Sequence, residues 1–266
     1  MNNIQIANET LRILKNGCYQ AGEKTVKLGS TDYSAVEVIS PADGEKLLNE
    51  DISGCFSEKM CEIEVTAESS FAAAARLRQP MVMNFANAHK AGGGFRLGAK
   101  TQEETLCRCS TLYASIASQQ SKEMYRYNNT HISAVESDYM LFSPDVLVFR
   151  DDSGALMAEP FTVSVITLPA PNLYGAAMLA SKETVSNTLL RRIRIMLRIA
   201  VKNCCKELVL GAWGCGAFGN DPNLVASHFR TALVKDGLGK CFNKVVFAIY
   251  GKPDGKNITA FKNVFH

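Results

Sequence analysis

The sequence predicts an α/β fold in which helices cover both faces of a sheet. Two observations predict it. Short apolar segments typical of buried strands alternate with segments of helical periodicity, and two apolar segments lead directly into glycine-rich loops. The chain has 266 residues, of which 47% are hydrophobic and 21% charged, so it can bury a full core. No repeat or Pro- or Ser-rich linker divides it, which favours one cooperative unit.

The first third of the chain contains three expected elements. Residues 4–17 predict a short helix, because Ile6, Leu11, Ile13 and Leu14 fall near one face. Residues 24–40 alternate in the way typical of a hairpin or of edge strands. Residues 66–78 are alanine-rich and predict a helix, for which Thr66 is a suitable N-cap.

The rest of the chain alternates between expected strands and helices. Apolar strands are predicted at 81–86, 146–149, 161–166, 207–210 and 244–250. Helices are predicted from Thr101 through Ile116, over 182–205 and over about 221–236. The helix at 182–205 has one apolar stripe, and we expect its arginines (Arg191, Arg192, Arg194 and Arg198) to form a solvated face. Ligands of such sheets bind at loops beyond the strand C-termini, where both glycine-rich loops lie.

Composition excludes several classes of protein. A net charge of +3 indicates neither a nucleic-acid coat nor a membrane surface, so we expect no direct nucleic-acid binding. Without a signal peptide or an apolar run of ~18 residues, a cytoplasmic protein is expected. The nine cysteines are then reduced thiols. They form no metal-ligand pattern with the four histidines (His89, His131, His228, His266), so neither metal nor cofactor is expected.

The first glycine-rich loop carries three consecutive glycines, Gly92, Gly93 and Gly94, followed by Phe95. Three glycines at a strand exit favour a close backbone approach to a ligand, although a turn that needs conformational freedom is the simpler alternative. Gln102, Glu103 and Glu104 then open a helix. Thr101 and Glu104 also fit a capping box, which would give Glu104 a purely local function.

Adjacent glutamates restrict the chemistry that this loop could perform. Residues i and i+1 of a helix point about 100° apart, so they cannot face each other across a sugar as the two carboxylates of usual glycosidases do. If the site cleaves a glycosidic bond, one glutamate should serve as acid and then as base, and the other should hold sugar hydroxyls. A helix N-terminus favours the carboxylate, so a bound diphosphate would have to raise the pKa of the acid.

The second glycine-rich loop includes Gly214, Cys215, Gly216, Ala217 and Phe218. Its backbone N–H groups can converge on phosphate oxygens, and Asp221-Pro222 starts a helix whose N-terminus faces the loop. It is not a P-loop, because no Gly-Lys-Ser/Thr follows. Phe218 could instead be a core anchor, and plain core packing is the expectation for Trp213. Cys215 has no histidine nearby in sequence, which argues against a nucleophile.

The first loop resembles the signature of the microbial poly(ADP-ribose) glycohydrolases, in which three glycines are followed, after seven further residues, by Gln102-Glu103-Glu104. The segment before it, Asn84-Phe85-Ala86-Asn87-Ala88, resembles that family too. The resemblance runs from about residue 10 to the C-terminus and implies a macrodomain-like, three-layer α/β/α mixed sheet. We expect the catalytic domain over 61–266, with residues 1–60 as an extension packed on it. It implies that Glu104 protonates the ribose–ribose oxygen and then activates water. It also implies that Glu103 and Asn87 hold the distal ribose, that the second loop binds the pyrophosphate, and that Phe218 packs near the distal ribose.

The resemblance therefore implies an exo-acting enzyme that releases ADP-ribose from poly(ADP-ribose) or ADP-ribosylated macromolecules, with a role in the DNA damage response. Two alternatives stay open. A non-catalytic macrodomain would bind ADP-ribose without cleaving it, although a reader needs no acid such as Glu104. A hydrolase of single ADP-ribose groups could use the same pocket, and only the space beyond the distal ribose would distinguish it.

Overall fold

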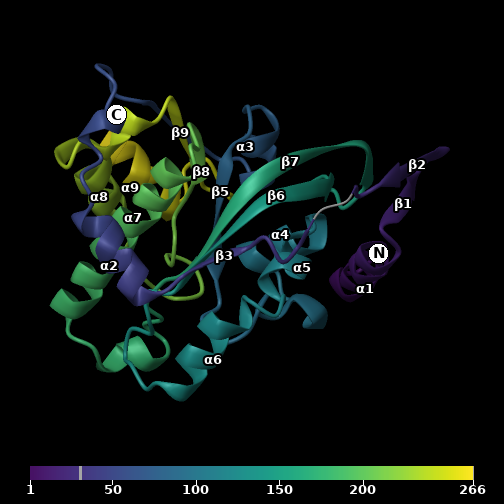
Figure 1. The fold of residues 1–266 in the computed structure, drawn as a ribbon, viewed down its shortest axis with the longest axis horizontal. Helices are drawn as coiled ribbons and strands as arrows, with labels where there is room; N and C mark the ends of the chain where they lie inside the picture. Colours follow the sequence, from purple (N-terminus) through teal and green to yellow (C-terminus); the bar gives the residue numbers. More distant parts are fainter. Residues whose placement is uncertain (30–31, 266) are drawn as a thin grey trace.

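The computed structural model describes residues 1–29 and 32–265. Its centre is a seven-stranded mixed sheet in the order β3-β6-β7-β5-β8-β9-β4 (Figure 1). These strands are β3 (Glu37–Ile39), β4 (Glu62–Thr66), β5 (Met81–Ala86), β6 (Met140–Arg150), β7 (Leu156–Pro169), β8 (Glu207–Leu210) and β9 (Lys244–Ala248). The five neighbouring strands from β7 to β4 are parallel, whereas β6 pairs antiparallel with both β7 and β3.

The parallel strands place five chain segments at one edge of the sheet. Because β4, β5, β7, β8 and β9 run in the same direction, the loops that follow them gather beyond their C-terminal ends. The inner strands β5, β8 and β9 are almost continuously apolar, as strands covered on both faces should be. The expected strands therefore form the centre of the sheet, and both glycine-rich loops lie at this edge.

Helices cover both faces of the sheet, which confirms the three-layer α/β/α arrangement (Figure 1). One apolar core lies under α2, α7, α8 and α9, and the other lies under α3, α4, α5 and α6. The bounds are α2 (Pro41–Asn49), α3 (Ser70–Ala75), α4 (Gln102–Cys109), α5 (Leu112–Ile116), α6 (Lys122–Thr130), α7 (Lys182–Lys202), α8 (Pro222–Arg230) and α9 (Lys256–Phe265). Short helical turns occur at η1 (Ser53–Cys55), η2 (Phe95–Leu97), η3 (Ala176–Leu179), η4 (Thr231–Lys235, a π-turn) and η5 (Leu238–Cys241).

The first 60 residues are joined to the core at several points. Helix α1 (Asn3–Asn16) packs beside α4, where the Thr10 hydroxyl donates to the Arg108 carbonyl at 2.8 Å. The hairpin of β1 (Cys18–Ala21) and β2 (Lys24–Lys27) encloses a small core of its own with Phe149. Strand β3 adds an edge to the central sheet. The expected helix is confirmed as α1. Of the segment expected as a hairpin or edge strands over 24–40, residues 24–27 and 37–39 are strands, and the hairpin partner β1 was not predicted. Residues 30 and 31 lie outside the described residues, together with His266.

Two sequence expectations about element boundaries were wrong. The helix expected from Thr66 begins at Ser70 and is capped by the Ser69 side chain, whereas Thr66 ends strand β4. Strand β4 was not predicted because its sequence contains two glutamates. Glu62 and Glu64 pair with Lys244 at the sheet edge. The helix expected through Ile116 is broken at Ser110, whose extended backbone bridges to Val148 of β6. Helix α9 was not predicted.

The arginines of α7 are not all solvated, which corrects a further expectation. Arg192 is completely buried, and its guanidinium donates to Asp138 Oδ1 at 2.8 Å and to the carbonyls of Pro169 at 2.9 Å and Val135 at 2.6 Å. Periodicity alone could not reveal it, because the partners lie about 20 to 60 residues away in sequence. Within residues 1–29 and 32–265, no helix is long and apolar enough to cross a membrane.

Candidate active site

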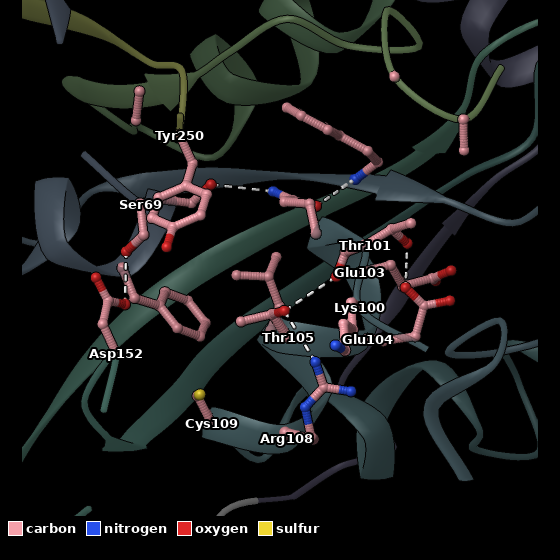
Figure 2. A pocket seen from close by; sticks show the side chains of 18 of the residues that line it. Ser69, Lys100, Thr101, Glu103, Glu104, Thr105, Arg108, Cys109, Asp152 and Tyr250 are labelled. Carbon is pink, nitrogen blue, oxygen red and sulfur yellow. Dashed lines mark hydrogen bonds between the residues drawn. The ribbon is translucent and has the colours of Figure 1, made fainter. Parts of the chain in front are cut away.

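A cleft of about 850 Å³ lies at the C-terminal edge of the parallel strands. Its walls come from α4, from the loops after β5, β8 and β9, from α3 and from α1. Eight of the residues expected to form the site line it: Asn87, Gln102, Glu103, Glu104, Gly214, Gly216, Ala217 and Phe218. Figure 2 shows Glu103 and Glu104 on one side of the cleft and Tyr250, Ser69 and Asp152 on the other.

Glu104 is held by a group outside its own helix. Its Oε1 accepts the backbone N–H of Gly94 at 2.9 Å, and its Oε2 accepts the hydroxyl of Thr101. Thr101 precedes α4 but makes no side-chain bond to the backbone of that helix. The purely local capping-box alternative is therefore wrong, because the triple-glycine loop orients one oxygen of Glu104 toward the cleft wall.

Glu103 is the more deeply buried of the two glutamates, with 2% of its surface exposed. Its Oε2 accepts the Asn87 backbone N–H at 2.8 Å, and its Oε1 lies 3.4 Å from the Asn84 amide nitrogen. Burial raises the pKa of Glu103 to about 8, although these hydrogen bonds act in the opposite direction. At neutral pH this carboxyl therefore holds a proton, and its burial rather than a ligand is the cause.

Gly93 lets the two carboxyls come together. A Cβ atom on Gly93 would lie 2.5 Å from Glu104 Oε1 and 3.2 Å from Glu103 Oε2, so both side chains occupy the space that a side chain would need. Its φ of +50° also favours glycine. Gly92 packs on Tyr113 and Gly94 on Ala99, so these two glycines serve the folding of the loop.

Gln102 lines the cleft but uses its side-chain amide on the protein, and Phe95 does not line the cleft. The Gln102 side chain donates to the Met83 carbonyl at 2.7 Å and to Ser70 Oγ at 3.1 Å, and it accepts the Phe85 N–H at 2.9 Å. It thereby fixes the N-terminus of α4 to β5. The ring of Phe95 is 1% exposed and lies against Tyr113, with ring centroids 4.7 Å apart.

Asn87 presents an amide donor to the cleft. Its Oδ1 accepts the backbone N–H groups of His89 at 2.8 Å and Lys90 at 3.0 Å. The amide oxygen therefore faces the loop, and the amide nitrogen points away from it. Among the described residues nothing accepts from its Nδ2, which is free to bind a ligand oxygen. The asparagine that the sequence motif marked thus donates its backbone N–H to Glu103 and lines the cleft.

The second glycine loop is folded tightly onto the core. Gly214 has a φ of +73°, and a Cβ there would lie 2.6 Å from Ala170 and 2.7 Å from Asn220. Asn220 holds the loop closed by donating to the carbonyls of Pro171 at 2.8 Å and Gly214 at 3.1 Å. Gly216, in contrast, has open space where a side chain would be. Its backbone is therefore accessible to a ligand in the cleft.

The side chains around that loop separate into core and cleft positions. Trp213 is fully buried and donates to the Leu168 carbonyl at 3.2 Å, as expected for core packing. Burial raises the pKa of the Cys215 thiol to about 12, which removes it as a nucleophile. Phe218 is partly buried against the core and also lines the cleft, so the two interpretations of this residue do not exclude each other.

Three features of the cleft were not found from the sequence. The Thr101 hydroxyl on Glu104 is one, and the capping-box spacing could have pointed to it. The aromatic side chains of Phe71, in α3, and Tyr250, after β9, also line the cleft. No group of three metal-ligating side chains occurs within residues 1–29 and 32–265.

Comparison with known proteins gives consistent matches. The family described as "Microbial-type PARG, catalytic domain" matches residues 7–151. The poly(ADP-ribose) glycohydrolase of Thermomonospora curvata is 36% identical, with 99% of each chain covered and a TM-score of 0.91. Its complex with the inhibitor ADP-HPD gives a TM-score of 0.88 at 36% identity, with 98% of each chain covered.

A second relative is less completely aligned. The poly(ADP-ribose) glycohydrolase of Deinococcus radiodurans in complex with ADP-ribose is 38% identical, covers 86% of this chain and 93% of its own, and has a TM-score of 0.79. A search of curated proteins found no match.

Proposed function

Since this chain belongs to the family of microbial-type poly(ADP-ribose) glycohydrolases, we propose that it hydrolyses ribose–ribose bonds of poly(ADP-ribose) and releases ADP-ribose from the chain end. One observation carries the proposal. The carboxyls of Glu103 and Glu104 converge over Gly93, in a cleft that the second glycine loop also lines. The cleft therefore combines an acid pair with a backbone site for phosphate.

The cleft can hold ADP-ribose along its length. The backbone of Gly214, Gly216 and Ala217 would bind the diphosphate, because backbone N–H groups in such a loop converge on anionic oxygens. Asn87 Nδ2 would donate to the distal ribose, beside Phe218. The adenine would lie between Phe71 and Tyr250, whose rings offer the apolar faces that a base requires.

Glu104 would perform both proton transfers. Its carboxyl gives a proton to the bridging oxygen as the bond between that oxygen and the anomeric carbon breaks. The resulting carboxylate then takes a proton from the water that attacks the anomeric carbon, so Glu104 ends protonated as it began. The oxocarbenium-like centre gains its electron pair from that water.

Glu103 would hold the ribose hydroxyls and help to retain a proton in the site. Two carboxyls that converge on one point disfavour a second negative charge, and burial already raises the pKa of Glu103 to about 8. Glu103 can therefore hold a proton beside Glu104 before substrate arrives.

Incubation with defined poly(ADP-ribose) tests the proposal. We expect the native protein to release free ADP-ribose and Glu104→Gln to release at least about a hundredfold less, because general acid–base catalysis contributes about that much or more. Glu23→Gln, at an exposed position of the β1–β2 turn, is the matched control and should keep full activity. Binding of polymer by the native protein without release of product would instead identify a reader.

The wider setting of the enzyme is also part of the proposal. We propose ADP-ribosylated macromolecules as its partners, the cytoplasm as its location and the DNA damage response as its context. All nine cysteines are free, as a reducing compartment requires. We further propose that residues 61–266 form the catalytic domain, with residues 1–60 packed on it through α1 and β3.

A further inference from the structure

A second cavity of about 260 Å³ adjoins the cleft at its glutamate end. Asn87, Ala170 and Phe218 line both cavities, and His89, Glu136 and Asn172 line only the second. Its volume corresponds to roughly eight or nine water molecules at about 30 Å³ each, enough for part of a sugar. The proposed chemistry does not use this cavity.

Glu136 is an unusual residue in the wall of this cavity. Only 7% of its side chain is exposed, and its Oε2 has no hydrogen-bond partner within the described residues. His89 Nε2 lies 4.0 Å from Oε1. A buried acceptor without a donor is unfavourable in the empty protein, and a ligand hydroxyl would relieve this.

The backbone of Glu136 is strained and held in place from both sides. Its φ is +55°, a conformation that residues other than glycine rarely adopt. The hydroxyl of Ser133 donates to the Glu136 carbonyl at 3.1 Å, and Arg192 donates to the carbonyl of Val135. The Ser137 N–H donates to Asn128, which in turn donates to the Ala88 carbonyl in the triple-glycine loop.

We propose that this second cavity binds the ribose on the leaving side of the scissile bond, with Glu136 accepting its hydroxyls. The inference rests on the proposed function and extends it to substrate preference. A carboxyl oxygen accepts hydrogen bonds from sugar hydroxyls, whereas a diphosphate offers only acceptor oxygens, so a sugar fits this cavity and a diphosphate does not. The enzyme then recognises two sugars, one on each side of Asn87 and Phe218.

The position of the cavity agrees with this use. Asn87 would hold the distal ribose from the cleft, and its own backbone N–H binds Glu103. A group that continues beyond that ribose reaches the wall shared by the two cavities. His89 is half-exposed at the rim, so the remainder of a polymer chain can leave the cavity toward solvent.

Two substrates and two variants test the inference. One substrate is a linear ADP-ribose dimer, and the other is ADP-ribose with an aryl group on the same anomeric oxygen, which lacks the second sugar. We expect Glu136→Gln and Glu136→Gly to lower kcat/KM for the dimer by about tenfold or more, the effect of losing a hydrogen bond from a ribose hydroxyl to a buried carboxyl oxygen. With the aryl compound both variants should stay within about twofold of the native protein.

Thermal stability distinguishes a role of Glu136 in binding the ribose from a role in stabilising the fold. Glycine adopts the φ of Glu136 more easily, and its introduction removes a buried acceptor without a partner, so the Tm of Glu136→Gly should be no lower than that of the native protein. A lower Tm, equal losses with both substrates, or an unchanged kcat/KM for the dimer would overturn the inference. A native protein that cleaves neither substrate would show that the proposed function itself is wrong.

Discussion

The tightest steric constraint of the site lies at a glycine, Gly93, rather than at a catalytic side chain. Gly93 leaves room for the carboxyls of Glu103 and Glu104, and a methyl group would lie 2.5 Å from Glu104 Oε1. Gly93→Ala should therefore displace Glu104 and lower kcat roughly a hundredfold, since misplacement of a reacting group by about 1 Å has effects of that size. Steady-state kinetics with polymer checks this.

A glycine without such contacts provides the control for that prediction. Gly54 has no atom within 4 Å of the Cβ position and no positive φ, so Gly54→Ala should keep native kinetics. Equal activity of the two alanine variants would show that the position of the Glu104 carboxyl does not limit the reaction.

At this scale the sequence indicated residue types better than it indicated contacts. The adjacency of Glu103 and Glu104 excluded a pair of carboxylates facing each other across a sugar, and the structure places both over Gly93. The contact of Glu104 with the Gly94 N–H could not be predicted, because it depends on how the loop folds back. Glu136 carried no sequence signal, since its strained φ and its burial exist only in the fold.

Among the elements, the start of helix α4 is fixed to its neighbours by the side chain of Gln102. Gln102 joins the start of this helix to β5 and α3 through three hydrogen bonds. Gln102→Ala leaves the Phe85 N–H and the Met83 carbonyl without these partners, which should lower the free energy of unfolding by about 1–3 kcal/mol. Thermal unfolding checks it, and kcat should fall as well because α4 carries both glutamates. An unchanged Tm together with a raised KM would instead make Gln102 a substrate ligand.

Helix α7 contains a matched pair of arginines. Arg192 is buried and binds Asp138, whereas Arg194 makes an exposed ion pair with Asp236. Arg192→Met should lower the free energy of unfolding by about 3–5 kcal/mol, because it leaves Asp138 and two carbonyls without their partner. Arg194→Met should change it by less than about 1 kcal/mol. Denaturant unfolding of both variants decides whether the two sites differ as expected.

Elements with strong apolar patterns were predicted well from the sequence. The strands at 81–86 and 207–210 and the long helix α7 were found nearly at their observed bounds. Strand β4 was missed because it lies at the edge of the sheet, where Glu62 and Glu64 bind Lys244 instead of facing a core. The break at Ser110 was missed because it depends on a bridge to Val148 in a distant strand.

For the molecule as a whole, the cleft is a product of topology. Its walls come from segments as far apart in sequence as α1 and the loop after β9, and parallel pairing brings the loops after β5, β8 and β9 to one edge. The sequence predicted two of these loops from their glycines. The aromatic end with Phe71 and Tyr250 had no comparable pattern, because its residues become neighbours only when β4 and β9 pair.

The stability of the whole molecule should depend on pH through Glu103. Its pKa is raised by burial from 4.5 to about 8, so the folded protein retains a proton that the unfolded chain releases. A group with a raised pKa stabilises the fold fully below its unfolded pKa, and this contribution is lost as the pH rises through the folded value. The Tm of the native protein should therefore fall between about pH 5 and about pH 8.

Glu103→Gln isolates this effect, because glutamine keeps the shape of the protonated acid and does not ionise. The Tm of the variant minus that of the native protein should grow by several degrees as the pH rises over that interval, while groups common to both proteins cancel. A difference that does not vary with pH would mean that Glu103 is ionised throughout. In that case its hydrogen bonds to the Asn87 N–H and the Asn84 amide would outweigh its burial, and the proton for the first step would have to arrive with the substrate.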